Sequence, residues 1–172
     1  MEQNVYGGKF VTVTEEVIDN CVYERVYIQN AMTILPVDDQ GRILFIKEKR
    51  IHETPQIRWK PVTGYFETGF NLEENANREL QEEIGKKAES ITPFFQMQLS
   101  GTVNMTQYFV IARNLFNSKL PNPDGEDTIL DIAPLDMEEI LKRTLEGEFA
   151  KGSVGYGLMK LYYEIQHGNL IL

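Results

Sequence analysis

Hydrophobic and polar residues alternate along the first part of the chain, with the two-residue period of half-buried strands. Residues 9–14 and 21–29 both show this alternation and are rich in β-branched and aromatic side chains. Between them, Asp19-Asn20 is typical of a turn. We therefore predict an N-terminal β-hairpin. Because an isolated two-stranded hairpin is only marginally stable in water, this one needs a surface to pack on.

The next segment predicts a second hairpin. Residues 31–36 and 42–47 have strand patterns and flank the turn-forming run Asp38-Asp39-Gln40-Gly41. Within the second of these strands, Ile43-Leu44-Phe45-Ile46 is continuously apolar, which is typical of a strand buried on both faces. We therefore expect the hydrophobic core to lie on both sides of a sheet.

The rest of the chain alternates between helices and strands. Because helices then flank a mixed sheet on both sides, the pattern predicts an α/β fold of the α/β/α sandwich type. We expect residues 1–172 to form a single domain, with residues 1–29 as the N-terminal hairpin and residues 30–172 as the core. A polar loop is predicted for residues 51–58, a helix between Asn71 and Gly85, and a turn-rich acidic loop for residues 120–127. The remaining predicted strands span residues 91–98, 105–112 and 129–134, and the remaining helices span residues 137–146 and 153–167.

The first predicted helix has clear end signals and one apolar side. Asn71 is a suitable N-cap, and Glu74 three residues later completes a capping box. Gly85 is a natural residue just beyond the C-terminal end. With about 100° between successive residues, the apolar side chains cover an arc of roughly 120° that should face the core. These apolar residues are Leu72, Ala76, Leu80 and Ile84.

Three glutamates lie on or near this core-facing side. Glu83 projects into the apolar arc, Glu79 lies at its edge, and Glu82 lies further round. A carboxylate at the rim of a buried surface is costly unless it is paired or bound to a metal. Mg²⁺ prefers oxygen ligands and is commonly shared with substrate phosphates. The alternative, exposed acids linked to Lys86 and Lys87, suits Glu82 but explains Glu83 poorly.

The overall charge limits the class of partner. The chain carries a net charge of −9 with a pI near 4.8, which argues against nucleic acid and against an anionic membrane surface. A small phosphorylated ligand remains compatible, because a bound metal can reverse the local field. Cys21 is the only cysteine, so no disulfide framework is expected. We find no signal peptide or apolar span, and expect a cytoplasmic protein.

The spacing of these residues resembles the Nudix hydrolase box, G-x5-E-x7-R-E-U-x-E-E-x-G-U, in which U is a bulky aliphatic residue. Two positions depart from the pattern: Phe70 replaces the first glutamate, and Lys86 replaces the last aliphatic residue. The resemblance implies a Nudix-like fold and a hydrolase that acts on phosphorus-containing anhydrides. The residues that match in register are Gly64, Arg78, Glu79, Leu80, Glu82, Glu83 and Gly85.

Looser features are similar to ADP-ribose pyrophosphatases within that family. They are the N-terminal hairpin, the basic segment Lys47-Glu48-Lys49-Arg50, the segment Trp59-Lys60-Pro61-Val62-Thr63-Gly64, and Glu148-Phe149-Ala150-Lys151 before the last helix. The family usually has Glu and Ala where this chain has Lys60 and Thr63. The resemblance implies metal-dependent hydrolysis of a nucleoside diphosphate linked to another moiety, such as ADP-ribose or another nucleotide sugar, by a homodimer. The alternative is a catalytically weakened binding or regulatory module on the same fold.

The resemblance also implies roles for single residues. Glu79 and Glu83 would be the main ligands of Mg²⁺ or Mn²⁺, with help from Glu82 and from the backbone carbonyl of Thr63. Arg78 would orient the glutamates, unless it is an ordinary surface arginine.

Four further residues complete the predicted site. Glu126, in the acidic loop, is the predicted general base, and the alternative is a solvated acidic turn. Glu67 matches a loop glutamate that is common before the box helix. Arg50 and Lys47 are predicted to contact substrate phosphates through charge-assisted hydrogen bonds.

Overall fold

The computed structural model describes residues 1–123, 125 and 128–172, so Glu126 lies outside the described residues. The described residues form nine strands and three helices. The strands are β1 (Gln3–Gly7), β2 (Val11–Ile18), β3 (Cys21–Ile28), β4 (Ala31–Pro36), β5 (Ile43–Lys49), β6 (Ile57–Tyr65), β7 (Lys86–Leu99), β8 (Val103–Asn117) and β9 (Ile129–Leu135). The helices are α1 (Leu72–Glu83), α2 (Met137–Leu145) and α3 (Ser153–Gln166).

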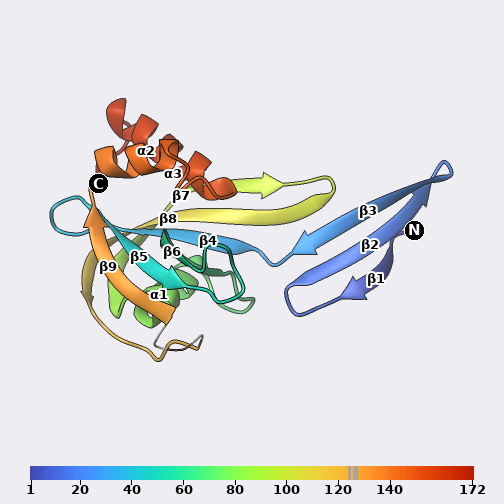
Figure 1. The fold of residues 1–172 in the computed structure, drawn as a ribbon, viewed down its shortest axis with the longest axis horizontal. Helices are drawn as coiled ribbons and strands as arrows, with labels where there is room; N and C mark the ends of the chain where they lie inside the picture. The colour runs from blue at the N-terminus through green and yellow to red at the C-terminus, as the bar shows by residue number, and fades with distance from the viewer. Residues whose placement is uncertain (124, 126–127) are drawn as a thin grey trace.

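The strands form a mixed sheet in the order β1-β2-β3-β8-β4-β6-β5-β9, with β7 also paired to β8. Strand β8 runs parallel to β3 and β4, and the other neighbours are antiparallel. The longest pairing joins β7 and β8, which form a long ribbon along the middle of the molecule (Figure 1). The predicted mixed sheet is therefore confirmed.

Helices cover both faces of this sheet, with α1 on one face and α2 and α3 on the other (Figure 1). The apolar run in β5 explains how both faces are filled. Leu44 and Ile46 pack in the cluster that contains α1 residues, whereas Ile43 and Phe45 pack in the cluster that contains α2 and α3 residues. Successive side chains of a strand point to opposite faces, so this strand contributes to two cores. The predicted α/β/α sandwich is confirmed.

The second predicted hairpin is wrong, because β4 and β5 are not neighbours. Asp38 does form the expected turn: its carboxylate accepts hydrogen bonds from the backbone N–H groups of Gln40 and Arg42, each at 2.9 Å. The two strands then meet only at a single bridge between Val37 and Ile43. Beyond it, β6 lies between them and pairs with both. A local turn pattern cannot reveal a later strand that inserts between its two arms.

The N-terminal hairpin is confirmed as β2 and β3, which are antiparallel. Asp19 and Asn20 have positive φ angles of 51° and 64°, as a two-residue hairpin turn requires. Strand β1 extends the hairpin to three strands, which the sequence pattern did not predict. This small sheet projects away from the core (Figure 1) and joins it through short parallel pairing of Val26 with Val103.

The predicted helices at the C-terminal end are confirmed as α2 and α3. Asp136 caps α2, where its carboxylate accepts a hydrogen bond from the backbone N–H of Glu139 at 2.8 Å. No helix in the described part of the chain has both the length and the apolar character needed to cross a membrane.

Candidate active site

Helix α1 holds the acidic residues in place and has the end structure that its sequence predicts. Asn71 and Glu74 form the capping box, with reciprocal hydrogen bonds of 2.9 and 2.8 Å between side chain and backbone. Gly85 follows the helix with a φ of +66°. The apolar residues of α1 are buried against β4, β5 and β6, so Glu79, Glu82 and Glu83 are fixed beside β6.

A hollow of about 960 Å³ opens beside these glutamates. Lys47 does not line it, although its ammonium lies 5.9 Å from the centroid of the Trp59 ring, which does. Lys47 alternates with Ile46 and Glu48 along β5, and this alternation directs it to the other face. The sequence-predicted site residues that do line the hollow are Arg50, Thr63, Glu67, Arg78, Glu79, Glu82 and Glu83.

Glu79 is the least compensated carboxylate of the site. Burial, followed by repulsion from Glu83 and Glu82, raises its pKa from 4.5 to about 8. Gly64 makes room for it, because a Cβ atom at position 64 would lie 1.9 Å from the Glu79 carboxyl carbon. The glycine of the box is therefore required at this position by the close approach of a side chain. A half-buried carboxylate with two other carboxylates nearby is a suitable ligand for a cation.

Glu83 is more deeply buried but has partners. Its two oxygens accept hydrogen bonds from the Lys60 ammonium at 3.5 Å and from the Thr63 backbone N–H at 3.4 Å. Burial raises the pKa of Glu83 to about 7, even though the positive charge of Lys60 opposes this rise. The position of Glu83 inside the apolar arc, predicted from the helical angle, agrees with its exposure of only 8%.

Glu48 is a buried acid that the sequence interpretation missed. It is 2% exposed and forms ion pairs with Arg50 at 2.9 Å and Lys60 at 3.1 Å. Burial alone would raise the pKa of Glu48, but Lys60 and Arg50 more than offset it and hold that pKa below its usual range. The alternation of β5 contained the signal, since Glu48 lies two residues beyond the buried Ile46 and shares its face. The three basic residues around Glu48 at positions 47–50 led to a prediction of a basic segment, and the single acid among them was not considered.

Arg78 connects the loop before α1 with the helix itself. Its guanidinium donates a hydrogen bond to Glu67 at 2.6 Å and lies 3.7 Å from a Glu82 oxygen. The Phe70 ring is also close, with its centroid 5.3 Å from Arg78 Cζ, while remaining 47% exposed. Phe70 is therefore not a core residue, and Arg78 has contacts that an ordinary surface arginine lacks.

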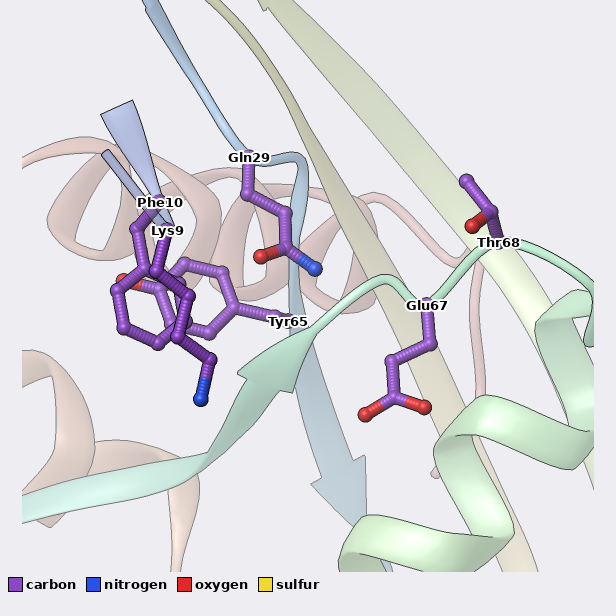
Figure 2. Close-up of a pocket in the computed structure, with 6 residues that line it drawn as sticks. All are labelled: Lys9, Phe10, Gln29, Tyr65, Glu67 and Thr68. Atoms are coloured by element: carbon purple, nitrogen blue, oxygen red, sulfur yellow. The ribbon is translucent and has the colours of Figure 1, made fainter. Parts of the chain in front are cut away.

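A smaller hollow of about 300 Å³ adjoins the main one (Figure 2). Phe10 and Tyr65 stack there with ring centroids 4.8 Å apart and an interplanar angle of 15°. Lys9 lies beside the stack, and the Glu67 carboxylate points away from it toward α1 (Figure 2). The sequence interpretation did not predict this aromatic pair, because its two members come from segments 55 residues apart in the chain.

The donor set suits a hard divalent cation, although it is not a complete cluster. Among the described residues, no three acidic, histidine or cysteine side chains form a ready-made metal site. Glu79 supplies a half-buried carboxylate with a raised pKa, and Glu82 lies one helical turn away on the same side. Glu83, by contrast, is partly neutralised by Lys60.

Comparison with solved structures supports the fold. A structure described as an ADP compounds hydrolase matches with a TM-score of 0.77 and 22% identity, over 98% of this chain and 93% of that one. A MutT structure, from work on the Aliivibrio salmonicida and Vibrio cholerae proteins, matches with a TM-score of 0.53 and 16% identity. That match covers 66% of this chain and 84% of the other.

Comparison of sequences gives the family. A protein of Bacillus subtilis (strain 168) described as an ADP-ribose pyrophosphatase is 25% identical over 93% of this chain and 89% of its own length. Residues 28–153 match the NUDIX domain, a range that contains the whole box and α1. The chain therefore belongs to the Nudix family and is a Nudix hydrolase.

Proposed function

We propose that this Nudix hydrolase cleaves the pyrophosphate bond of a nucleoside diphosphate linked to another moiety, with ADP-ribose or another nucleotide sugar as substrate. The observation that carries the proposal is the half-buried carboxylate of Glu79, with its raised pKa, beside Glu82 and Glu83 in a hollow of about 960 Å³. The relatives described as an ADP-ribose pyrophosphatase and an ADP compounds hydrolase support the substrate class.

Nudix hydrolases generally use divalent metal ions. In this chain, Glu79, Glu82 and Glu83 would hold Mg²⁺, together with the backbone carbonyl of Thr63, and Mn²⁺ can take the same place. When bound, the ion neutralises phosphate charge and lowers the pKa of a bound water. The acidic chain as a whole repels polyanions, so this local site, and not the overall charge, would attract the substrate.

Basic residues around the hollow would bind the substrate phosphates. Arg50 lines the hollow and is held by Glu48 at 2.9 Å, so its position is already fixed before binding. Lys47 is less suitable, because it does not line the hollow. Arg78 would act as a positioning residue for Glu82, while Glu67 restrains Arg78 from the loop.

Glu126 remains our candidate for the general base. The described chain lines the hollow at Asn122 and Pro123, shortly before this residue. A glutamate near the reacting water could accept its proton once the geometry of the complex is formed.

The stacked pair of Phe10 and Tyr65 offers an aromatic surface for the nucleobase. The pair borders the small hollow, which shares Lys9 and Glu67 with the main one. A base stacked on an aromatic ring gains roughly 1–3 kcal/mol without depending on the identity of the base. This arrangement would place the nucleoside beside the N-terminal sheet and the pyrophosphate near α1.

We further propose that the chain is a single domain that acts as a cytoplasmic homodimer, in which residues 1–29 contribute to the interface and residues 30–172 form the catalytic core. The N-terminal sheet supports this, because it carries apolar side chains that are exposed. Among them, Val17 and Val22 face each other across β2 and β3 and are each 63% exposed. Contiguous exposed apolar surface of this kind is typical of an interface.

A binding or regulatory module on the same fold is the second candidate function. The contact between Lys60 and Glu83 favours it, since a lysine beside a metal-binding carboxylate weakens the attraction for a metal. The replacement of a box glutamate by Phe70 acts in the same direction.

Turnover of a panel of nucleotide sugars by the purified full chain distinguishes the two. We expect Mg²⁺-dependent release of a nucleoside monophosphate from at least one of them, ADP-ribose being the first to test. Saturable binding of a nucleotide sugar without any turnover would instead support the module.

A further inference from the structure

Lys60 places a positive charge inside the acidic site. This residue is only 9% exposed, and its ammonium lies between two carboxylates that come from different elements. It contacts Glu48 Oε1 at 3.1 Å, Glu83 Oε1 at 3.5 Å and the Thr63 hydroxyl at 2.8 Å. An ammonium group has three N–H donors, and three oxygen acceptors surround it here. The three oxygen atoms therefore surround the ammonium as oxygen ligands surround a bound metal ion.

We propose that the Lys60 ammonium is a resident cation of the active site, and that it takes the place a second divalent ion would otherwise occupy between Glu48 and Glu83. The inference rests on the proposed function in that it assumes a divalent ion bound at Glu79. The chain would then bind one divalent ion, where the same carboxylates without Lys60 would bind more.

The charges on the two sides of the site support this division. On one side, the carboxylates of Glu48 and Glu83 are balanced by Lys60 and Arg50, which leaves no net charge to attract a further cation. On the other side, Glu79 lines the hollow together with Glu82, whose carboxylate lies 3.7 Å from Arg78, and a divalent ion that binds Glu79 displaces the proton that its carboxyl group retains. A divalent ion is therefore attracted to the Glu79 side.

Glu83 can still serve the bound ion. Each carboxylate oxygen has two acceptor positions, and in this structure Oε1 accepts from Lys60 and Oε2 from the Thr63 N–H. One acceptor position on each oxygen is left for the ion bound at Glu79. An ion placed between Glu48 and Glu83 would instead have to displace the ammonium.

Direct measurement of bound Mn²⁺ tests the inference on the full chain without substrate, with free Mn²⁺ followed by electron paramagnetic resonance. We expect one tightly bound ion per chain in the wild-type protein. Lys60→Met removes the charge at similar side-chain length, and should add a second ion or tighten binding by about tenfold or more. Lys60→Arg keeps the charge and should remain at one ion.

Lys151→Met is a matched control, because Lys151 lines the same hollow but pairs with Glu53, 3.2 Å away, and not with a box glutamate. It should bind Mn²⁺ as the wild type does. The inference is overturned if the wild type binds two ions tightly, or if folded Lys60→Met binds Mn²⁺ like the wild type. The wild-type stoichiometry is decisive even if Lys60→Met fails to fold.

Parallel ADP-ribose turnover separates this inference from the proposed function. Changed Mn²⁺ binding in Lys60→Met, in a protein that hydrolyses no nucleotide sugar, would support the resident cation and reject the proposed reaction. Metal-dependent turnover by a wild-type protein that binds two ions tightly would instead support the proposed reaction and reject the resident cation.

Discussion

Gly64 lies so close to Glu79 that a Cβ atom at position 64 would stand 1.9 Å from the carboxyl carbon of the glutamate. The glycine ends no element and sits within β6, where it pairs with Met32 of β4. Its role is therefore to admit the carboxylate into the site.

Gly64→Ala should displace the Glu79 carboxylate while the protein remains folded, because the obstructing atoms belong to the end of a flexible side chain. We expect metal affinity and kcat/KM to fall by about tenfold or more, as for other changes that misplace a metal ligand. Isothermal titration with Mn²⁺ and a turnover assay measure both. Gly7→Ala is the control, since its new Cβ would meet only an ordinary contact at 3.7 Å. Wild-type metal affinity in Gly64→Ala would show that Glu79 is not a ligand.

Glu83→Gln should lower kcat by about 100-fold or more, because a metal ligand is lost from the site. The amide occupies nearly the same volume and can keep the hydrogen bond from the Thr63 N–H, so the fold should survive. Steady-state kinetics with circular dichroism provide the test. Gln81→Glu is the control: it makes the opposite change on the same helix, at a residue outside the acidic group, and should leave kcat close to the wild-type value. If folded Glu83→Gln turns over at close to the wild-type rate, the assigned role of Glu83 is wrong.

The metal-free protein should lose stability as the pH rises from about 5 to about 8. The pKa values of Glu79 and Glu83 in the folded state, about 8 and about 7, lie above the ordinary value of 4.5. The folded state thus retains protons that the unfolded state releases, and the free energy of unfolding falls through this range. Urea unfolding in EDTA at several pH values measures it. Glu79→Gln should flatten the decline, and a free energy of unfolding that rises over the same range would contradict the account.

Phe70→Glu should raise activity or metal affinity by about tenfold, the lower end of the effect reported for residues that orient metal ligands. The Phe70 ring is 47% exposed and 5.3 Å from the Arg78 guanidinium, so a carboxylate there can meet Arg78 without being buried. The melting temperature should change little. Both kcat/KM in Mg²⁺ and the melting temperature are to be measured on the same variant. Unchanged activity with a large loss of stability would mean that Phe70 supports the fold and not the site.

The N-terminal sheet should mediate a homodimer. Val22→Lys places a charge at a side chain that is 63% exposed and paired with Val17, so it should disrupt an apolar interface without unfolding the sheet. Sedimentation at micromolar concentration should give a dimeric mass for the wild type and a lower mass for the variant. Tyr23→Lys, on the opposite face of the same strand and also exposed, is a control for the added charge. A wild type that sediments as a monomer would reject the proposed interface.

Sequence patterns predicted the elements well where the information is local. The capping box at Asn71, the turn at Asp19-Asn20 and the two-sided burial of residues 43–46 all depend on near neighbours in the chain. Strand order depends on distant pairing, which is why the insertion of β6 between β4 and β5 could not be predicted. The fully exposed β1 lacks the alternation that marks a strand with one buried face.

The site residues on α1 were predictable from the sequence, whereas the contacts that neighbouring strands make with them were less so. The helical angle alone placed Glu83 in a buried position and Glu79 at its edge. Lys60 was visible as a departure from the family pattern, but its contacts with Glu48 and Glu83 join three separate elements. Such contacts depend on how the sheet and helix pack, and spacing along the chain does not reveal them.

The central claim is most directly tested by incubating the purified chain with ADP-ribose, in Mg²⁺ and in EDTA, and separating the products. The account predicts AMP and ribose 5-phosphate in equal amounts in Mg²⁺, neither product in EDTA, and strongly reduced product from Glu79→Gln. Intact ADP-ribose in Mg²⁺, despite saturable binding to the folded protein, would contradict hydrolysis of this substrate. The same product yield from Glu79→Gln as from the wild type would contradict the assigned metal site.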